Sequence, residues 1–548
     1  MPVDRSIVRG VLGLIAPLAL SFFPIPGAAA EDLLPADKPI PEAIDHYLAA
    51  SLAKANVSPA QQVEDATYLR RVMLDLVGRI PTPPEAKAFA ESQEPDKRAK
   101  LVDELMASPS YARYQAYELD LMLMPSGKGS SLKEYLNVAV TENRSWDRIF
   151  RELLQAEGAG KAPAGAELFL KERVSDLDKM TNDVSILFFG VNIGCAMCHD
   201  HPLVGDWSQG HFYGMKSFFS RSYEVNNFVG ERSYGGVTYK TTDGESRDAK
   251  LMFLTGEVIA EPAWKEPNDA EKKKEKELIE ELKKKKEAPP KPEFSRRAKL
   301  VEIALAKGKD DFFSRSMVNR LWTRLYGHGL VDPVDQMHSG NKTKHPELLT
   351  WLARDFSEHG YDLKRVIRGL VLSQTYGRSS RWENGDRPKP EQFATALSRP
   401  LTPVQYAVSL KIASMAPSSF VALEKKDEAR KQIEQIESSG RGMSSMFEVP
   451  GADFQVSADE ALAMTNSSRV ESELLVESKD RIVGHLLTIT DERAMLDTAM
   501  LNILGRLPED AERQALSDYL SRRTDRRPQA VKQVVWALLT DTEFRFNY

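Results

Sequence analysis

Apolar residues recur at helical spacing along most of the chain, and this pattern predicts a mainly α-helical protein. In residues 68–76 the apolar positions lie three or four residues apart, and Gly78 follows as a C-terminal cap residue. Pro83 then opens the next helix, because proline is tolerated in a first turn. Residues 96–107 form another amphipathic helix. We expect this first group of short helices to extend over residues 39–120.

A change of pattern marks a small β-containing insertion in residues 220–261. Apolar residues are interspersed there with glycines, which is typical of a few short strands. On either side the pattern is helical again. An apolar helix spans residues 176–192, and helices return over residues 294–380 and 458–548. The fold class that we expect is therefore mainly α and multi-helical, with two domains and this one β-containing part.

A run of charge separates the two domains. Residues 271–287 contain eight lysines and six glutamates, and a proline-rich stretch follows at 289–292. Such a run is typical of an exposed helix, and the prolines stiffen the segment after it. We expect residues 39–265 to form the first domain, residues 266–293 to form a charged helix and linker, and residues 294–548 to form a second helical domain.

One short sequence occurs near both ends of the chain. Residues 74–81 read LDLVGRIP and resemble residues 501–508, which read LNILGRLP, and Glu85 then matches Glu512. A duplicated helical module that mediates docking would explain this similarity. Two similar helix–Gly–Pro–helix corners, each burying an apolar stripe, would explain it as well. We favour the second explanation, because such corners are common between helices.

The first thirty residues have the pattern of a secretory signal peptide. Arg5 and Arg9 give it a positive start, residues 11–23 are apolar, and the alanines at 28–30 form an A-x-A cleavage site before Glu31. The apolar stretch is too short for a good membrane span, and no later segment approaches that length. We expect an exported protein, periplasmic or extracellular, with no integral membrane span. The formal net charge of −6 gives no reason to expect nucleic-acid binding.

The only two cysteines of the chain form a C-x-x-C-H motif with the histidine that follows them. Cys195, Cys198 and His199 have the spacing that covalent attachment of a c-type haem needs. The two thiols add across the two vinyl groups of the porphyrin, and the imidazole can then bind the iron as the proximal ligand. The sixth iron ligand can be His211 or Met215, on the following helix, or the position stays open.

Two other interpretations of the motif remain. Cys195 and Cys198 can join His211 and either His199 or His201 in a tetrahedral site for zinc or another thiophilic metal. The cysteines can also form a disulfide, which an exported setting favours and which needs no cofactor. The aromatic residues around the motif fit a wall for a haem, although ordinary core is the default for such a group. They are Phe188, Phe189, Trp207, Phe212, Tyr213, Phe218 and Phe219.

The motif and its surroundings resemble a planctomycete cytochrome-like domain of unknown function. The matching pieces are residues 188–191, the sequence CAMCHDHP at 195–202, Trp207 and the aromatic residues within 212–219. The resemblance implies the same CxxCH site and little more about activity. His211 departs from the pattern, because the resemblance leads us to expect an acidic residue at that position.

A second block resembles the domain that usually follows that one, which is also of unknown function. Its matching pieces include VNRLW at residues 318–322 and HPELL at residues 345–349. The two similarities together cover most of residues 40–548. The second domain is expected to dock against the first or to recruit a partner.

These observations predict an exported c-type-cytochrome-like protein with a single covalent haem. It would serve electron transfer or another haem-dependent process outside the cytoplasm, with an exported protein or redox protein as its partner. The competing hypothesis is a non-haem exported scaffold or binding protein, in which the cysteine turn is a structural metal site or a disulfide. The sequence contains neither a phosphate-binding loop nor a G-x-S-x-G nucleophile motif, so it defines no enzyme class.

Overall fold

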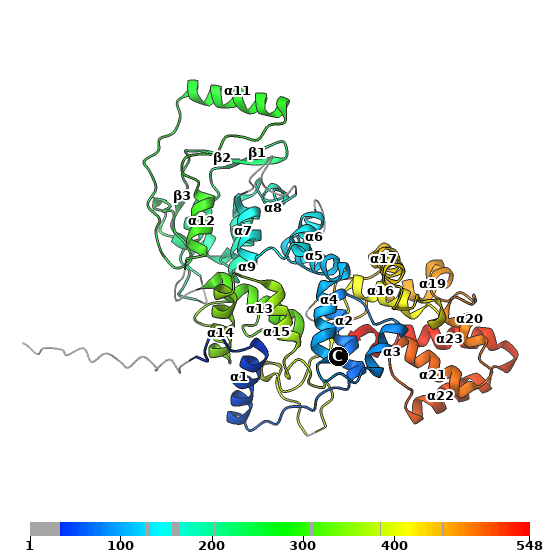
Figure 1. Cartoon of the computed structure of the whole chain (residues 1–548). Helices are drawn as coiled ribbons and strands as arrows, with labels where there is room; N and C mark the ends of the chain where they lie inside the picture. The colour runs from blue at the N-terminus through cyan, green and yellow to red at the C-terminus, as the bar shows by residue number, and fades with distance from the viewer. Residues whose placement is uncertain are drawn as a thin grey trace, which may run out of the picture.

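The structure is a computed structural model that describes residues 33–125, 131–155, 165–201, 204–306, 311–383, 385–451 and 454–548. Within these residues the fold is mainly α-helical, which confirms the predicted fold class (Figure 1). The strands of the described part form three two-stranded antiparallel sheets. The signal peptide expected in residues 1–30 lies outside the described residues.

Five helices form the first part of the chain, as the spacing of apolar residues predicts. α2 ends at Gly78, and Thr82 caps α3 through a capping box with Glu85, in which each residue bonds to the backbone of the other. The helices are α1 (Ile40–Lys54), α2 (Asp65–Val77), α3 (Pro83–Glu91), α4 (Lys97–Ala107) and α5 (Pro109–Leu123).

The next segment carries the cysteine motif and ends in two β-hairpins. In the first hairpin Ser222 pairs with Glu231, and in the second Thr238 pairs with Asp248, so the β-containing insertion is confirmed. The elements are α6 (Lys133–Thr141), α7 (Trp146–Gln155), α8 (Leu168–Lys171), α9 (Leu177–Phe189), the 3₁₀ turn η1 (Gly194–Met197), α10 (Gln209–Ser217), β1 (Ser222–Val225), β2 (Phe228–Glu231), β3 (Thr238–Lys240) and β4 (Ser246–Asp248).

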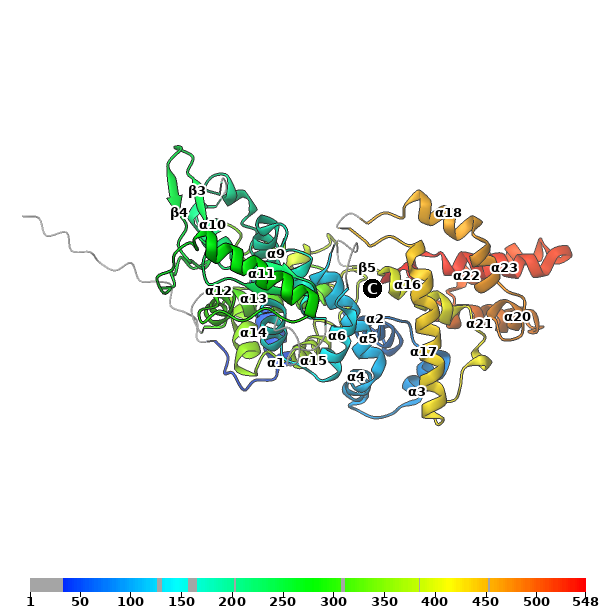
Figure 2. The ribbon, with the colours of Figure 1, turned by 90° about the horizontal axis from the view of Figure 1, so that it is seen from above.

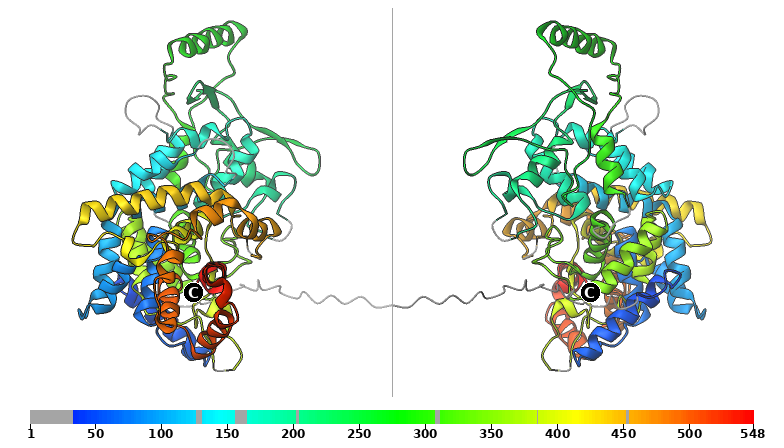
Figure 3. Two further views of the ribbon diagram at one scale, coloured as in Figure 1. Left: turned by 90° about the vertical axis from the view of Figure 1, so that its right-hand side faces the viewer. Right: turned by 90° about the vertical axis from the view of Figure 1, so that its left-hand side faces the viewer.

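The charged run forms α11 (Asp269–Lys285), which stands away from the rest of the molecule in both views of Figure 3. Leu282 is its one buried residue, so this helix is largely solvated, as the charge pattern predicts.

The chain then continues as further helices and one short sheet. The elements are α12 (Arg296–Ala304), α13 (Phe312–Tyr326), α14 (Pro346–Glu358), α15 (Leu363–Val371), η2 (Pro390–Gln392), β5 (Arg399–Pro400), α16 (Pro403–Ala413), η3 (Pro417–Ser419), α17 (Lys426–Met443), η4 (Ser444–Met446), α18 (Ala458–Asn466), α19 (Ser468–Glu473), α20 (Ile482–Leu487), α21 (Glu492–Ile503), α22 (Asp510–Ser521), η5 (Thr524–Arg526), α23 (Arg527–Leu539), α24 (Thr542–Arg545) and β6 (Phe546–Asn547).

Two clusters of buried apolar side chains hold these elements together. The first cluster takes residues from Ile40 to Phe393, on both sides of α11. The second takes residues 401–544 and also Leu74 and Ile80, from the end of α2 and the corner that follows it. Figure 2 accordingly shows α2 and α5 between α9–α14 on one side and α16–α23 on the other. The end of α2 therefore joins the two cores, while the domain boundaries given above stay predictions.

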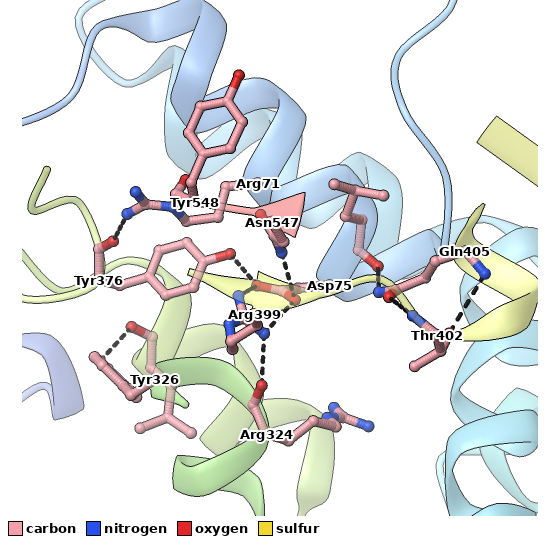
Figure 4. A network of polar contacts seen from close by, with 12 residues as sticks. Arg71, Asp75, Arg324, Tyr326, Tyr376, Arg399, Thr402, Gln405, Asn547 and Tyr548 are labelled. Atoms are coloured by element: carbon pink, nitrogen blue, oxygen red, sulfur yellow. Dashed lines mark hydrogen bonds and ion pairs between the residues drawn. The ribbon is translucent and has the colours of Figure 1, made fainter. Parts of the chain in front are cut away.

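A buried carboxylate fixes the last strand to this junction (Figure 4). Asp75 on α2 accepts hydrogen bonds from the Tyr376 hydroxyl (2.6 Å), from both terminal nitrogens of Arg399 (2.9 and 2.8 Å) and from the Asn547 amide (3.0 Å). Arg399 also pairs with Asn547 in the sheet of β5 and β6. A single side chain thus ties α2 to segments more than 300 residues away in sequence.

Candidate functional site

The segment that leads into the cysteine motif is held by the second half of the chain. The backbone N–H of Met337 donates to the Gly190 carbonyl (3.0 Å), and the N–H of Asn192 donates to the Asp335 carbonyl (2.9 Å). From α13, the Arg320 guanidinium donates to the Ile186 carbonyl near the end of α9. Burial lowers the pKa of Arg320 to about 10, although the nearby Asp335 opposes that shift. Arg320 of the VNRLW block and the backbone of residues 335–337 therefore position the start of the turn.

The turn itself is a short 3₁₀ helix whose first residues are fixed by two asparagine side chains. The amide oxygen of Asn182 accepts from the N–H of Ile193 (3.2 Å), and that of Asn192 accepts from the N–H of Gly194 (3.1 Å). Ala196 is buried, whereas Cys195 and Cys198 are exposed free thiols. The turn thus anchors its backbone in the protein and presents both sulfur atoms to solvent.

The exit from the turn is held by α10. The Gln209 side-chain amide donates to the Cys198 carbonyl (3.1 Å), and the Tyr213 hydroxyl donates to the Met197 carbonyl (3.0 Å). The backbone N–H of Gln209 donates in turn to the Asp200 carboxylate (2.9 Å). Tyr213 also stacks on Tyr239 of the second hairpin, with ring centroids 4.3 Å apart. The β-containing insertion therefore packs against α10, the helix that holds the exit of the turn.

His199 is exposed and has a defined ring orientation. Its Nδ1 lies 2.7 Å from the carbonyl oxygen of Asp200. A carbonyl oxygen only accepts, so Nδ1 carries the proton, and the Nε2 of the neutral ring keeps a lone pair. Metal-bound histidines commonly have this arrangement, in which one ring nitrogen donates to a carbonyl and the other binds the metal. The three residues of the CxxCH motif are thus accessible and chemically suited to a haem.

His211 lies in the first turn of α10, where its ring closes a capping box with Ser208. The backbone N–H of Ser208 donates to Nδ1 of His211 (3.2 Å), so the neutral ring carries its proton on Nε2. His211 occupies the position of α10 where glutamate closes a capping box, and it accepts the same backbone bond. The acidic residue that the resemblance leads us to expect is replaced by another acceptor. Burial lowers the pKa of His211, and Asp200 and Asp206 oppose the shift.

The remaining candidate ligands do not gather around the two thiols. Met215 is completely buried in the first core, so its thioether could reach an exposed iron only if the core opened. The backbone N–H of His201 bonds to the Trp207 carbonyl (2.8 Å). Within the described residues, no group of three or more histidine, cysteine, aspartate or glutamate side chains is placed to hold a metal ion.

Most of the aromatic residues near the motif belong to the core. Phe188 packs on Phe150 with ring centroids 4.7 Å apart, and Phe189 packs on Phe253 at 5.2 Å. Trp207 is buried too and meets the His211 ring edge-on at 5.8 Å. These rings form the part of the hydrophobic core on which the turn lies, which is the ordinary role of buried aromatic residues.

An open cleft of about 420 Å³ lies beside the loop that follows the motif. Asp206 on this loop accepts from the backbone N–H and the hydroxyl of Ser339 (2.7 and 2.6 Å). His338 lines the same cleft, and burial lowers its pKa, with opposing influence from Asp206. The cleft is lined by residues from both halves of the chain, Asp206 after the motif and residues within 312–346, and neither cysteine lines it.

Sequence reasoning missed the residues that hold the turn. Asn182, Asn192 and Gln209 act through side-chain hydrogen bonds to backbone atoms, and such bonds have no spacing rule that marks them in a sequence. Arg320 did have a signal, because it stands in the VNRLW block. Its contact with Ile186 crosses 134 residues and becomes visible only in the fold.

The fold and site define a helical protein in which a solvent-facing CxxCH turn is built by two segments that are distant in sequence. Residues 43–224 match the family model described as PSCyt2, a protein of unknown function (DUF1549), and residues 296–520 match PSD1, a protein of unknown function (DUF1553). The chain belongs to the proteins that carry these two domains in this order, as the resemblance predicted.

No curated protein and no solved structure matches the chain. In the part of the chain that the structure describes, no helix is both long and apolar enough to cross a membrane.

Proposed function

We propose that this protein is an exported c-type-cytochrome-like electron carrier with one haem bound covalently at the CxxCH turn. Cys195 and Cys198 would each form a thioether as the S–H adds across a vinyl group, the sulfur bonding to one carbon and the hydrogen going to the other. His199 would be the proximal ligand. When bound, the haem supplies a reversible one-electron couple.

The observation that carries this proposal is the state of His199. Its Nδ1–H is committed to the Asp200 carbonyl at 2.7 Å, which orients the ring and leaves Nε2 as the metal-binding nitrogen. The exposed thiols support the same role, because a haem and its attachment machinery must reach both sulfur atoms. Gln209 and Tyr213 would hold the backbone of the turn while the thioethers form.

Export is part of the proposal. The support for it is the signal-peptide pattern of residues 1–30 together with the chemistry of the motif, since c-type haem is attached outside the cytoplasm. Expression in a bacterium followed by fractionation and N-terminal sequencing tests this part. We expect a mature chain that begins at Glu31 in the exported fraction, and an uncleaved chain confined to the cytoplasm would contradict it.

The haem itself is tested by expressing the full chain with a c-type maturation system. We expect a Soret band, and haem that stays attached to the chain on a denaturing gel. The double variant Cys195→Ser with Cys198→Ser should lose attached haem completely. Met197→Leu changes a side chain inside the motif but no haem-binding group, so this variant should keep the attached haem. A folded protein without a Soret band, with bound zinc or with a Cys195–Cys198 disulfide by mass, would refute the proposal.

A further inference from the structure

Two corners of the chain, far apart in sequence, contain the same arginine–glutamate ion pair. We define the first corner as residues 74–85 and the second corner as residues 501–512. In the first, Arg79 donates to both carboxylate oxygens of Glu85 (2.8 and 2.7 Å). In the second, Arg506 donates to both carboxylate oxygens of Glu512 (2.7 and 2.7 Å). The bidentate geometry is the same, down to the atoms that are joined.

The backbone of the two corners also matches. The arginine of each corner donates to the carbonyl of the next residue, at 3.1 Å in both. The glutamate of each corner accepts from the backbone N–H three residues before it, at 2.8 Å in both. The glycine that ends the helix is left-handed in both, with φ of 71° at Gly78 and 78° at Gly505. The sequence similarity therefore reflects one local structure that occurs twice.

The first corner is covered by α16. The Gln405 side-chain amide donates to the Leu74 carbonyl (2.9 Å), and the backbone N–H of Ile80 donates to the Ser409 hydroxyl (3.2 Å). Leu74 and Ile80 have exposed fractions of 0 % and 2 %, and both belong to the second core. One apolar helix with an amide and a hydroxyl four residues apart thus completes this corner.

The second corner is only partly covered in the described part of the chain. Its Asn502 amide donates to the Ala413 carbonyl at the end of α16 (2.8 Å), and its Arg506 also pairs with Glu543 of α24 (2.7 and 2.6 Å), but no described helix lies over its outer leucines. Leu501 matches Leu74 and is 50 % exposed, and Leu507 matches Ile80 and is 54 % exposed. Leu507 also lines a cleft of about 520 Å³ with Arg506 and Trp382. Figure 1 shows α21 and α22 at the outer edge of the molecule, whereas α2 and α3 lie near its middle. The second corner thus buries Ile503 and Leu504 in the second core, as the explanation favoured from the sequence expects, but it leaves Leu501 and Leu507 exposed.

We propose that the second corner is a docking surface for an apolar helix of a partner protein, which binds it as α16 binds the first corner. The occupant must present a narrow apolar face to Leu501 and Leu507. It must also carry polar side chains four residues apart that can bond to the corner's backbone. The helix cannot come from α16 of a second copy, because every residue of α16 is buried. This proposal is independent of the haem.

The test uses a labelled synthetic peptide of residues 401–416, the α16 segment itself, as the probe for the full-length protein. Fluorescence anisotropy should show saturable binding. Leu501→Glu and Leu507→Glu should each weaken it at least tenfold, because a charge then faces the apolar side of the helix. Leu462→Glu is the matched control, since Leu462 on α18 is 56 % exposed and lies outside the corner. It should bind the peptide as well as the wild type.

Three results would overturn the proposal. The first is the absence of saturable binding. The second is that a scrambled peptide binds as tightly as the α16 peptide, or that Leu507→Glu binds the α16 peptide as tightly as the wild type does. The third is a concentration-dependent dimer in sedimentation that Leu507→Glu abolishes, because the occupant would then be a second copy of this chain. Circular dichroism of each variant shows that the fold is kept, which exposed positions allow. Loss of peptide binding with an intact Soret band, or the reverse, separates this proposal from the haem proposal.

Discussion

The buried carboxylate of Asp75 gives the sharpest test of how this molecule is held together. Asp75→Ala removes a side chain that is 4 % exposed and that accepts four hydrogen bonds. It leaves the Arg399 guanidinium without its counter-charge at the junction of the two cores. Removing one partner of a buried ion pair costs about 3–5 kcal/mol, because an uncompensated charge stays buried. We expect a loss of that size in the free energy of unfolding.

A surface pair provides the matched control for this measurement. Asp103 bonds to Arg368, and their side chains are 53 % and 43 % exposed, so Asp103→Ala should cost about 0–1 kcal/mol. Urea unfolding followed by tryptophan fluorescence measures both variants, with the midpoint and the slope compared to the wild type. Asp75→Asn, which keeps one acceptor oxygen, should fall between them. If Asp75→Ala lost no more stability than Asp103→Ala, the junction would not depend on this network.

Three further predictions follow from the same structure. Gly78→Ala should lower the free energy of unfolding by about 1–3 kcal/mol more than Gly505→Ala does, because a methyl group at Gly78 meets the Tyr114 ring while the space at Gly505 is open. Urea unfolding measures both variants, and equal losses would contradict the prediction. Arg320→Met should speed hydrogen exchange of the backbone amides that hold the motif by about five- to thirtyfold, the effect of one lost hydrogen bond of about 1–2 kcal/mol; unchanged protection would show that the arginine is dispensable. His211 has a lowered folded pKa, so the unfolded chain binds its proton first as the pH falls below 6.5. The free energy of unfolding of the wild type, measured relative to His211→Gln, which keeps the capping acceptor, should therefore fall below that pH in urea titrations; a constant difference would refute the shift.

The spacing of apolar residues was enough to predict the helical fold, because that spacing reflects which face each helix buries. Residues 68–76 and Gly78 define α2 and its end, and the charge run defines α11. Spacing could not show that Leu74 and Ile80 belong to a different core from most of α2, since a short apolar segment does not identify its partner.

The candidate site was predicted only in part. The spacing of Cys195, Cys198 and His199 identified the turn, because their chemistry depends on neighbours in sequence. Ligands from elsewhere were harder to assign. His211 caps α10 and Met215 lies in the core, while a ligand role for either residue stays a prediction, because residue type and distance along the chain do not separate these roles.

The contact between Asp75 and Asn547 also has a consequence for the time course of folding. The two residues are 472 positions apart, and synthesis at about 5–20 residues per second separates them by roughly 25 to 95 seconds. For the first 324 residues after Asp75 its carboxylate lacks the Arg399 guanidinium that neutralises it, and until position 547 it lacks the Asn547 amide. The nascent N-terminal half therefore cannot reach its native packing while it is being made. The molecule closes only after synthesis has passed β6, so a chaperone would have this long interval in which to engage an open chain.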